Sequence, residues 1–198
     1  RFRILNACNL RGLDISLSNG GIFTQIGTEL GLLHHPAEIK SFALEPAERI
    51  DVVIDFSRYE GQEIILADGD TSAQPADHTA FIMKFKVVCP LKCPDKSETP
   101  EDLFPYHPID ISLAAKQRTM QLDESTDKFG RVIHLLNGRM WHEPVTEVVK
   151  LDSIEIWHFV NNFVFPHSMH VHLVHFEIIG RKPFTDADFD EEGNYIFV

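Results

Sequence analysis

The sequence has 198 residues, of which 43% are hydrophobic and 24% are charged, a balance typical of globular proteins rather than of disordered or fibrous ones. Its 30 acidic and 18 basic residues give a formal net charge of −12, so we expect no nucleic-acid partner, because phosphate backbones would be repelled. No apolar run approaches the ~18 residues of a membrane-spanning helix, so we expect no membrane partner. This length suits one large domain or two small ones.

The first half of the chain carries short runs of β-branched and aromatic residues that partly alternate with polar ones. Such runs predict strands, and they cover residues 15–18, 50–56, 64–66 and 81–88. The opening residues, 1–6, also have strand character, so the chain is expected to begin inside a strand, as a fragment would. No stretch keeps the 3.6-residue period of a long helix. The sequence therefore predicts an all-β protein built as a sandwich or a barrel.

The segment 89–115 differs from its surroundings, because prolines and charged residues follow one another there without any periodicity. Such composition is typical of a linker or of a loop that crosses between domains. Strands are predicted again over residues 119–122, 132–137 and 153–161. A weak repeat joins the two halves: a strand that closes on Asn6 or Asn161 is followed about twenty residues later by an Ile-Gly pair. The repeat predicts further strands ending at these pairs, and two copies of one sandwich unit.

Three histidines lie within six residues, at His167, His170 and His172. On a strand, residues two apart face the same side, so His170 and His172 would present two imidazoles to one place. His167 would lie at the entrance of that strand, directly after Pro166. Imidazole binds copper, zinc, iron and nickel, so the spacing indicates a metal site without choosing the metal. His175 would fall on the opposite face and is expected to pack or to support the site.

The remaining histidines have no partner at ligand spacing in the sequence. We expect His34 and His35 to lie in a solvated loop. Cys8 is predicted to be a buried free thiol in a turn, whereas Cys89 and Cys93 allow either a small disulfide loop or a soft-metal pair. The sequence contains neither the Gly-x-Ser-x-Gly of a hydrolase nor a glycine-rich phosphate loop.

Taken together, these features resemble the multicopper oxidase family, most closely its bacterial spore-coat laccase and bilirubin-oxidase branch, over nearly the whole chain. The segments that carry the resemblance are residues 1–7, 25–28, 31–33, 44–49, 51–56, 135–139, 141–144, 167–172 and 181–184. The resemblance implies cupredoxin-like Greek-key β-sandwiches, incomplete at both ends. Residues 1–88 would be part of the family's middle domain, 89–115 the linker, and 116–198 the N-terminal part of its C-terminal domain.

The family motif His-Pro-x-His-x-His corresponds to residues 167–172, with Ser168 in place of the usual proline. The resemblance implies that His167 binds the type 1 copper, which accepts electrons from the substrate. It further implies that His170 binds the type 2 copper and His172 one copper of the type 3 pair. The serine affects the stiffness of the loop rather than the identity of the ligands, and Pro166 retains part of that stiffness.

By this resemblance the protein would be a copper-dependent oxidoreductase that oxidises phenolic or pigment substrates and reduces dioxygen to water. A type 1 site also needs a cysteine thiolate and a second histidine, and no cysteine of this chain is flanked by histidine. We therefore expect the chain alone to be inactive, with the missing ligands supplied by the remainder of the same protein or by another chain. The family also implies a spore-coat or extracytoplasmic location.

Two other functions stay open at this point. The chain could be a non-catalytic cupredoxin-like module with a structural or copper-binding role. It could also be a cupin-like mononuclear metal protein, because Glu177 follows the His-x-His pair. Cupins, however, need a glycine where Val164 stands, and they need a third histidine further along the chain.

Overall fold

The computed structural model describes residues 1–69, 80–89, 93 and 95–190, which contain eleven strands and two short 3₁₀ helices. The chain forms two compact units, residues 1–107 and 108–198, so the division falls inside the segment 89–115. Residues 90–92 and 94 of the predicted linker, and 191–198 of the predicted C-terminal domain, lie outside the described part. Within that part, no helix is long and apolar enough to cross a membrane.

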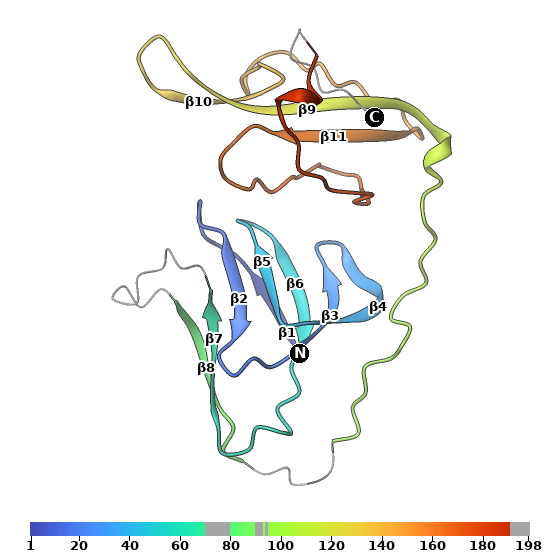
Figure 1. Ribbon diagram of the computed structural model, residues 1–198. Coiled ribbons are helices and arrows are strands. Elements are labelled where there is room, and N and C mark those ends of the chain that lie inside the picture. Colours follow the sequence, from blue (N-terminus) through green and yellow to red (C-terminus); the bar gives the residue numbers. More distant parts are fainter. Residues whose placement is uncertain (70–79, 90–92, 94, 191–198) are drawn as a thin grey trace. The chain divides into compact units, whose positions relative to one another are not determined.

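The first unit consists of two four-stranded sheets, each antiparallel throughout, as Figure 1 shows. One sheet has the order β1 (Phe2–Leu5), β6 (Arg49–Val53), β3 (Phe23–Thr28) and β4 (Gly31–Ile39). The other has the order β5 (Ser41–Leu44), β2 (Leu13–Leu17), β7 (Glu63–Asp68) and β8 (Phe81–Lys86). The chain crosses repeatedly from one sheet to the other, as it does in Greek-key sandwiches.

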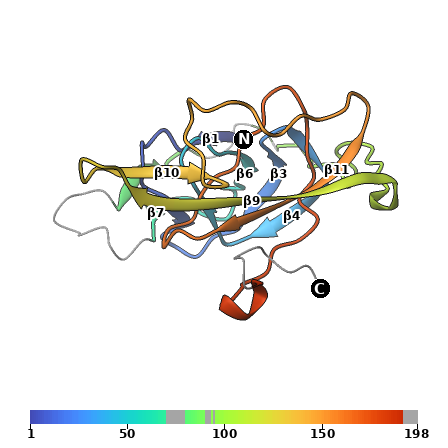
Figure 2. The same cartoon turned by 90° about the horizontal axis from the view of Figure 1, so that it is seen from above.

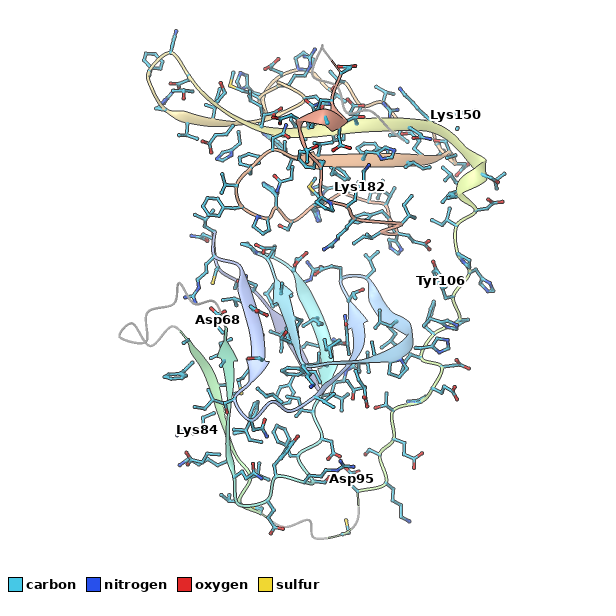
Figure 3. All side chains as sticks on the ribbon, viewed as in Figure 1. Asp68, Lys84, Asp95, Tyr106, Lys150 and Lys182 are labelled. Atoms are coloured by element: carbon cyan, nitrogen blue, oxygen red, sulfur yellow. The ribbon has the colours of Figure 1, made fainter. Side chains whose placement is uncertain are left out.

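Alternating apolar residues from both sheets form the core of this unit. On β7, for example, Ile64 and Leu66 are buried, whereas Glu63 is exposed and its Oε2 lies 2.8 Å from Nζ of Lys84 on β8 (Figure 3). This period of two is what a strand buried on one face requires. The buried core cluster comprises Ile15, Leu17, Phe23, Leu44, Ile50, Val52, Ile54, Ile64 and Leu66.

The second unit is organised around one long strand, β9 (Ala114–Thr126), which follows the 3₁₀ turn η2 (Ile111–Leu113). Seen from above in Figure 2, β9 runs between β10 (Val132–Leu136) and β11 (Ile154–Asn161). The β10 strand is antiparallel to β9, and β11 is parallel to it. A second 3₁₀ turn, η3 (Asp186–Asp188), lies near the end of the described residues.

The structure confirms the all-β fold class and the strands predicted around residues 15–18, 50–56, 64–66, 81–88, 119–122, 132–137 and 153–161. The strand expected to end at Ile178-Ile179-Gly180 is wrong, because the described residues 162–185 have no regular secondary structure. Within the described part, no neighbouring strand pairs with this segment, and a strand without a partner cannot satisfy its backbone hydrogen bonds.

Candidate metal centre

The segment 167–172 lies in the second unit, six residues beyond the end of β11, and it has no regular secondary structure. The prediction of a strand here is therefore wrong. The chain leaves the β9–β11 ladder through a turn in which Nδ2 of Asn161 donates to the Phe165 carbonyl at 2.8 Å. The Asn161 carboxamide also accepts from the Phe163 amide at 3.1 Å. One asparagine thus fixes the path along which the chain enters the histidine segment.

His170 and His172 lie together although no strand aligns them. Their ring centroids are 4.7 Å apart and their planes meet at 86°, an edge-to-face contact. Both side chains are exposed, so both are accessible to an ion from solvent. A sequence spacing of two residues brought the imidazoles to one place through a local bend rather than through the pleat of a sheet.

His167 stands apart from that pair. Its Nδ1 lies 2.8 Å from the Ser168 carbonyl oxygen, and its ring is 5.8 Å from the ring of Phe163. Within the described residues, His167, His170 and His172 do not bring three ligand atoms to one point. The segment therefore offers one pair of imidazoles and one separate imidazole.

His167 is supported by ring contacts that the sequence did not predict. The imidazole of His134 on β10 stacks on Phe163, with centroids 5.2 Å apart and planes at 26°. Phe163 in turn contacts His167, so one ring from β10 and two from the loop after β11 lie in a row. His134 has no partner at ligand spacing in the sequence, and the pairing of β10 with β9 brings it near the loop that follows β11.

The strands that lead into this segment are joined by an ion-pair cluster. Arg118 on β9 donates from Nε to Glu155 on β11 at 2.6 Å, and from Nη1 to Glu147 at 2.7 Å. Trp157 donates its indole N–H to the same Glu155 carboxylate at 2.9 Å. The hydrogen bonds from Arg118 hold the pKa of Glu155 below its usual value. The cluster secures the register of the parallel pair from which the histidine loop departs.

The other candidates from the sequence occupy separate places. Glu177, the residue of the cupin comparison, accepts a hydrogen bond from the Ile109 amide at 3.4 Å. Cys8 is exposed, so the prediction of a buried thiol is wrong, and Cys89 and Cys93 are also exposed with free thiols. His175 is exposed as well. Because the chain has three cysteines, all before residue 108, the second unit contains no thiolate ligand.

His34 and His35 are not in a loop, which corrects the prediction for them. Both lie on β4, at the edge of the first sheet. The apparent loop signal came from Pro36, which a strand tolerates at a sheet edge because its missing N–H leaves no ladder bond unmade there.

Comparison with known proteins yields one family model, described as Multicopper oxidase, which matches residues 107–196. This range contains all three predicted copper ligands.

Two curated relatives are similar over nearly the whole chain. A laccase of Bacillus subtilis (strain 168) is 42% identical over 198 residues, which cover 98% of this chain and 38% of that protein. A laccase of Bacillus stratosphericus is 40% identical over 200 residues, covering 100% of this chain and 39% of that protein. The chain therefore spans about two fifths of the length of these relatives.

Among solved structures, a laccase from Pediococcus acidilactici Pa5930 is similar with a TM-score of 0.60 and 27% sequence identity. The match covers 80% of this chain and 32% of that one. This similarity confirms the predicted fold class, an all-β fold of cupredoxin-like sandwiches.

Proposed function

The chain belongs to the multicopper oxidase family, and we propose that it forms part of a copper-dependent oxidase of the laccase type. The complete enzyme would oxidise phenolic or pigment substrates one electron at a time and pass the electrons to dioxygen, which is reduced to water. Because the chain spans about two fifths of its laccase relatives, both this activity and its substrates are proposed for the whole protein rather than for the chain alone.

The observation that carries the proposal is the contact between His170 and His172 inside the segment that matches the family model. Both imidazoles are exposed, and imidazole nitrogen is a good ligand for copper. The donor chemistry of the segment therefore fits the metal that the family implies. When bound, copper would supply one-electron redox chemistry that no side chain of this segment possesses.

We assign the three histidines to separate copper ions. His167 would bind the type 1 copper, His170 the type 2 copper and His172 one of the type 3 pair. The separate position of His167 fits this division, since its ring lies against Phe163 rather than with the other two. The task of the chain's own residues is to hold the loop: Asn161 fixes its entry, and Phe163 orients the His167 ring.

The second unit supplies only part of each ligand set. A type 1 site requires a thiolate, and every cysteine of the chain precedes residue 108. Partial sets hold copper but do not complete an electron path from substrate to dioxygen. We therefore expect the isolated chain to bind copper without consuming oxygen in the presence of a phenolic dye.

Copper per chain tests the ligand assignment. The protein is loaded with Cu²⁺, desalted and analysed for metal content, and its intact mass is determined on the same sample. We expect bound copper to fall when His170 and His172 are both replaced by glutamine, because the paired imidazole nitrogens are lost. In the electron paramagnetic resonance spectrum of the parent, nitrogen hyperfine splitting should accompany this copper and should weaken in the double variant.

The matched control is His175→Gln, which removes an exposed imidazole three residues beyond His172. It should leave the copper content unchanged. Equal loss in the control and in the double variant would contradict the assignment, because copper would then be held by exposed histidines in general. Steady oxygen uptake by the isolated chain would contradict the partial ligand set and favour a complete site within it.

A further inference from the structure

A second group of ligands lies in the first unit, outside residues 107–196, which match the family model. His34 and His35 on β4 and Asp102 on the extended segment after β8 each offer one ligand atom, and these atoms lie within 4.8 Å of one another. The two imidazole rings are in contact, with centroids 3.9 Å apart and planes tilted by 40°. We propose that these three residues form a surface site for a divalent transition-metal ion.

Consecutive residues of a regular strand point to opposite faces, so a local irregularity must bring these two rings together. Such an irregularity is present in the pairing of β3 with β4. Gln25 pairs with Ala37, but Gly27 pairs with Leu32, so two steps along β3 oppose five steps along β4. The extra residues of β4 include both histidines. A bulge of this kind re-aims side chains at a sheet edge, and here it places two imidazoles on one side.

The hydrogen bonds of both rings leave the same nitrogen free. Nδ1 of His34 lies 2.8 Å from the carbonyl oxygen of Phe104, and Nδ1 of His35 lies 2.9 Å from that of Glu101. A carbonyl oxygen only accepts, so each Nδ1 carries a proton, and in the neutral ring each Nε2 then carries the lone pair. Metal-binding histidines are commonly oriented in this way, by a second hydrogen bond on the far nitrogen. The rings are thus held in the tautomer that a metal requires before any metal arrives.

The extended segment is fastened beside β4 by its backbone. The Leu103 amide donates to the His34 carbonyl at 2.8 Å, and the ring of Tyr106, which Figure 3 labels, lies 6.1 Å from the His34 ring. These contacts keep Asp102 near the histidines, with its Oδ1 3.1 Å from Nδ1 of His35. A bound ion would therefore bridge two segments that are some seventy residues apart in the sequence.

The donor set selects the class of ion. Two imidazoles and one carboxylate suit zinc and copper, whereas calcium and magnesium prefer sites made of oxygen ligands. Glu38 and Glu101 line the same shallow groove as His35, so negative charge surrounds the position and attracts cations. In a tetrahedral zinc site the ligand atoms are roughly 3.3 Å apart. Because Oδ1 of Asp102 now lies 3.1 Å from Nδ1 of His35, the side chains would have to rotate to bring each Nε2 and the carboxylate around one ion.

Zinc titration tests this site separately from the copper ligands of the second unit. The parent for the experiment is the full chain carrying His170→Gln and His172→Gln, titrated with ZnCl₂ by calorimetry. We expect one zinc ion per chain, and at least a tenfold loss of affinity in each of His34→Asn, His35→Asn and Asp102→Asn. Asparagine is chosen for the histidines because its Nδ2 can still donate to the carbonyl that Nδ1 contacts, while no ligand replaces Nε2.

His107→Asn is the matched control, since it removes an exposed imidazole from the same segment without touching the site. Hydrogen exchange gives a second readout: zinc should slow the exchange of the Leu103 amide, whose bond to His34 lies within the bridge. Unchanged zinc affinity in the His34 and His35 variants would overturn the proposal. So would zinc binding that leaves Leu103 exchange unaltered. Neither result bears on the copper assignment of the other unit.

Discussion

At the scale of single residues, the first unit depends on one buried polar side chain, Asn6. Its Nδ2 donates to the carbonyls of Arg11 and Leu44, both at 2.8 Å, and its Oδ1 accepts from the Cys8 amide at 2.9 Å. Its own backbone bonds to Ala47 and Glu48 on the turn before β6. Asparagine can satisfy these three side-chain bonds at once because one carboxamide carries both donors and an acceptor. Asn6 is only 1% exposed, so any of these hydrogen bonds left unmade would cost free energy that water could not restore.

We predict that Asn6→Ala lowers the free energy of unfolding of the first unit by roughly 2–4 kcal/mol, because three backbone groups lose their partner. Urea denaturation followed by circular dichroism measures the change. Asn9→Ala, an exposed asparagine in the same turn, should cost no more than about 0.5 kcal/mol. If the two substitutions have equal effects, the hydrogen bonds of Asn6 do not stabilise the unit as described.

At the same scale, the sequence predicted one of the two contacts between histidine side chains and missed the other. The spacing of His170 and His172 predicted their meeting, and the rings do lie 4.7 Å apart, although the predicted strand is absent. Adjacent residues such as His34 and His35 are predicted to diverge on any regular strand. Their contact depends on a bulge set by the pairing of Gly27 with Leu32, which no local pattern contains. Pairing between strands, rather than propensity, decides such cases.

At the scale of elements, the parallel contact between β9 and β11 depends on charge as well as on packing. The Arg118 guanidinium lies 5.7 Å from the Trp157 ring centroid and is hydrogen-bonded to Glu155, to Glu147 and to the Val148 carbonyl. Only 7% of the Arg118 side chain and 7% of the Glu155 side chain are exposed. A nearly buried guanidinium with several partners fixes the register of the two strands. A shift in register would leave its charge buried without those hydrogen-bond partners.

This pairing predicts an acid-sensitive step in the second unit. The hydrogen bonds from Arg118 lower the pKa of Glu155 from its ordinary value of 4.5. A carboxyl whose pKa is lower in the folded state stabilises that state fully above the ordinary value. Its contribution is lost as the pH falls below 4.5 and through the folded-state pKa. We therefore expect the stability of the second unit to fall with pH in this acid range, and Glu155→Gln to reduce that dependence.

Trp157 fluorescence reports the step, in a Trp141→Phe background that removes the other, fully exposed tryptophan. Urea midpoints are measured across the acid range for this protein and for its Glu155→Gln variant. Glu124→Gln serves as the control, because it removes an exposed carboxylate from β9, the strand that pairs with β11. A pH dependence that is the same in all three proteins would contradict the role assigned to Glu155.

The sequence predicted the positions of individual strands better than it predicted any other feature of the structure. Runs such as residues 81–88 and 153–161 correspond closely to β8 and β11, because the alternation of strand residues is local. The same reasoning predicted a strand ending at Gly180, and that prediction was wrong. Its apolar residues satisfy a strand pattern, yet Ile178 and Ile179 remain exposed within the described part and no described strand pairs with them. The composition of a segment indicates that it can form a strand, and the presence of a pairing strand determines whether it does.

At the scale of the whole chain, the two units differ in how much apolar surface they bury. Nine buried hydrophobic residues form the core cluster of the first unit. Among the described residues of the second unit, the buried hydrophobic side chains are those of Met120, Leu122 and Val160. Each fully buried aliphatic side chain contributes about 1.5–3 kcal/mol relative to exposure. The second unit, which carries the proposed copper ligands, is therefore expected to be much the less stable of the two.

This difference predicts unfolding in two steps, with the second unit first. Hydrogen exchange followed by mass spectrometry should show faster exchange in β9 and β11 than in β3, β6 and β7, because local stability follows buried apolar contacts. In the His34→Asn, His35→Asn background, where the first-unit site is removed, copper should slow exchange in the second unit if His167, His170 and His172 hold it there, since a ligand stabilises the state that binds it. Zinc, bound at His34, His35 and Asp102 of the unsubstituted chain, should act on the first unit instead. One transition shared by all strands, unaffected by either metal, would show that the units fold as one and that neither ligand group binds its ion.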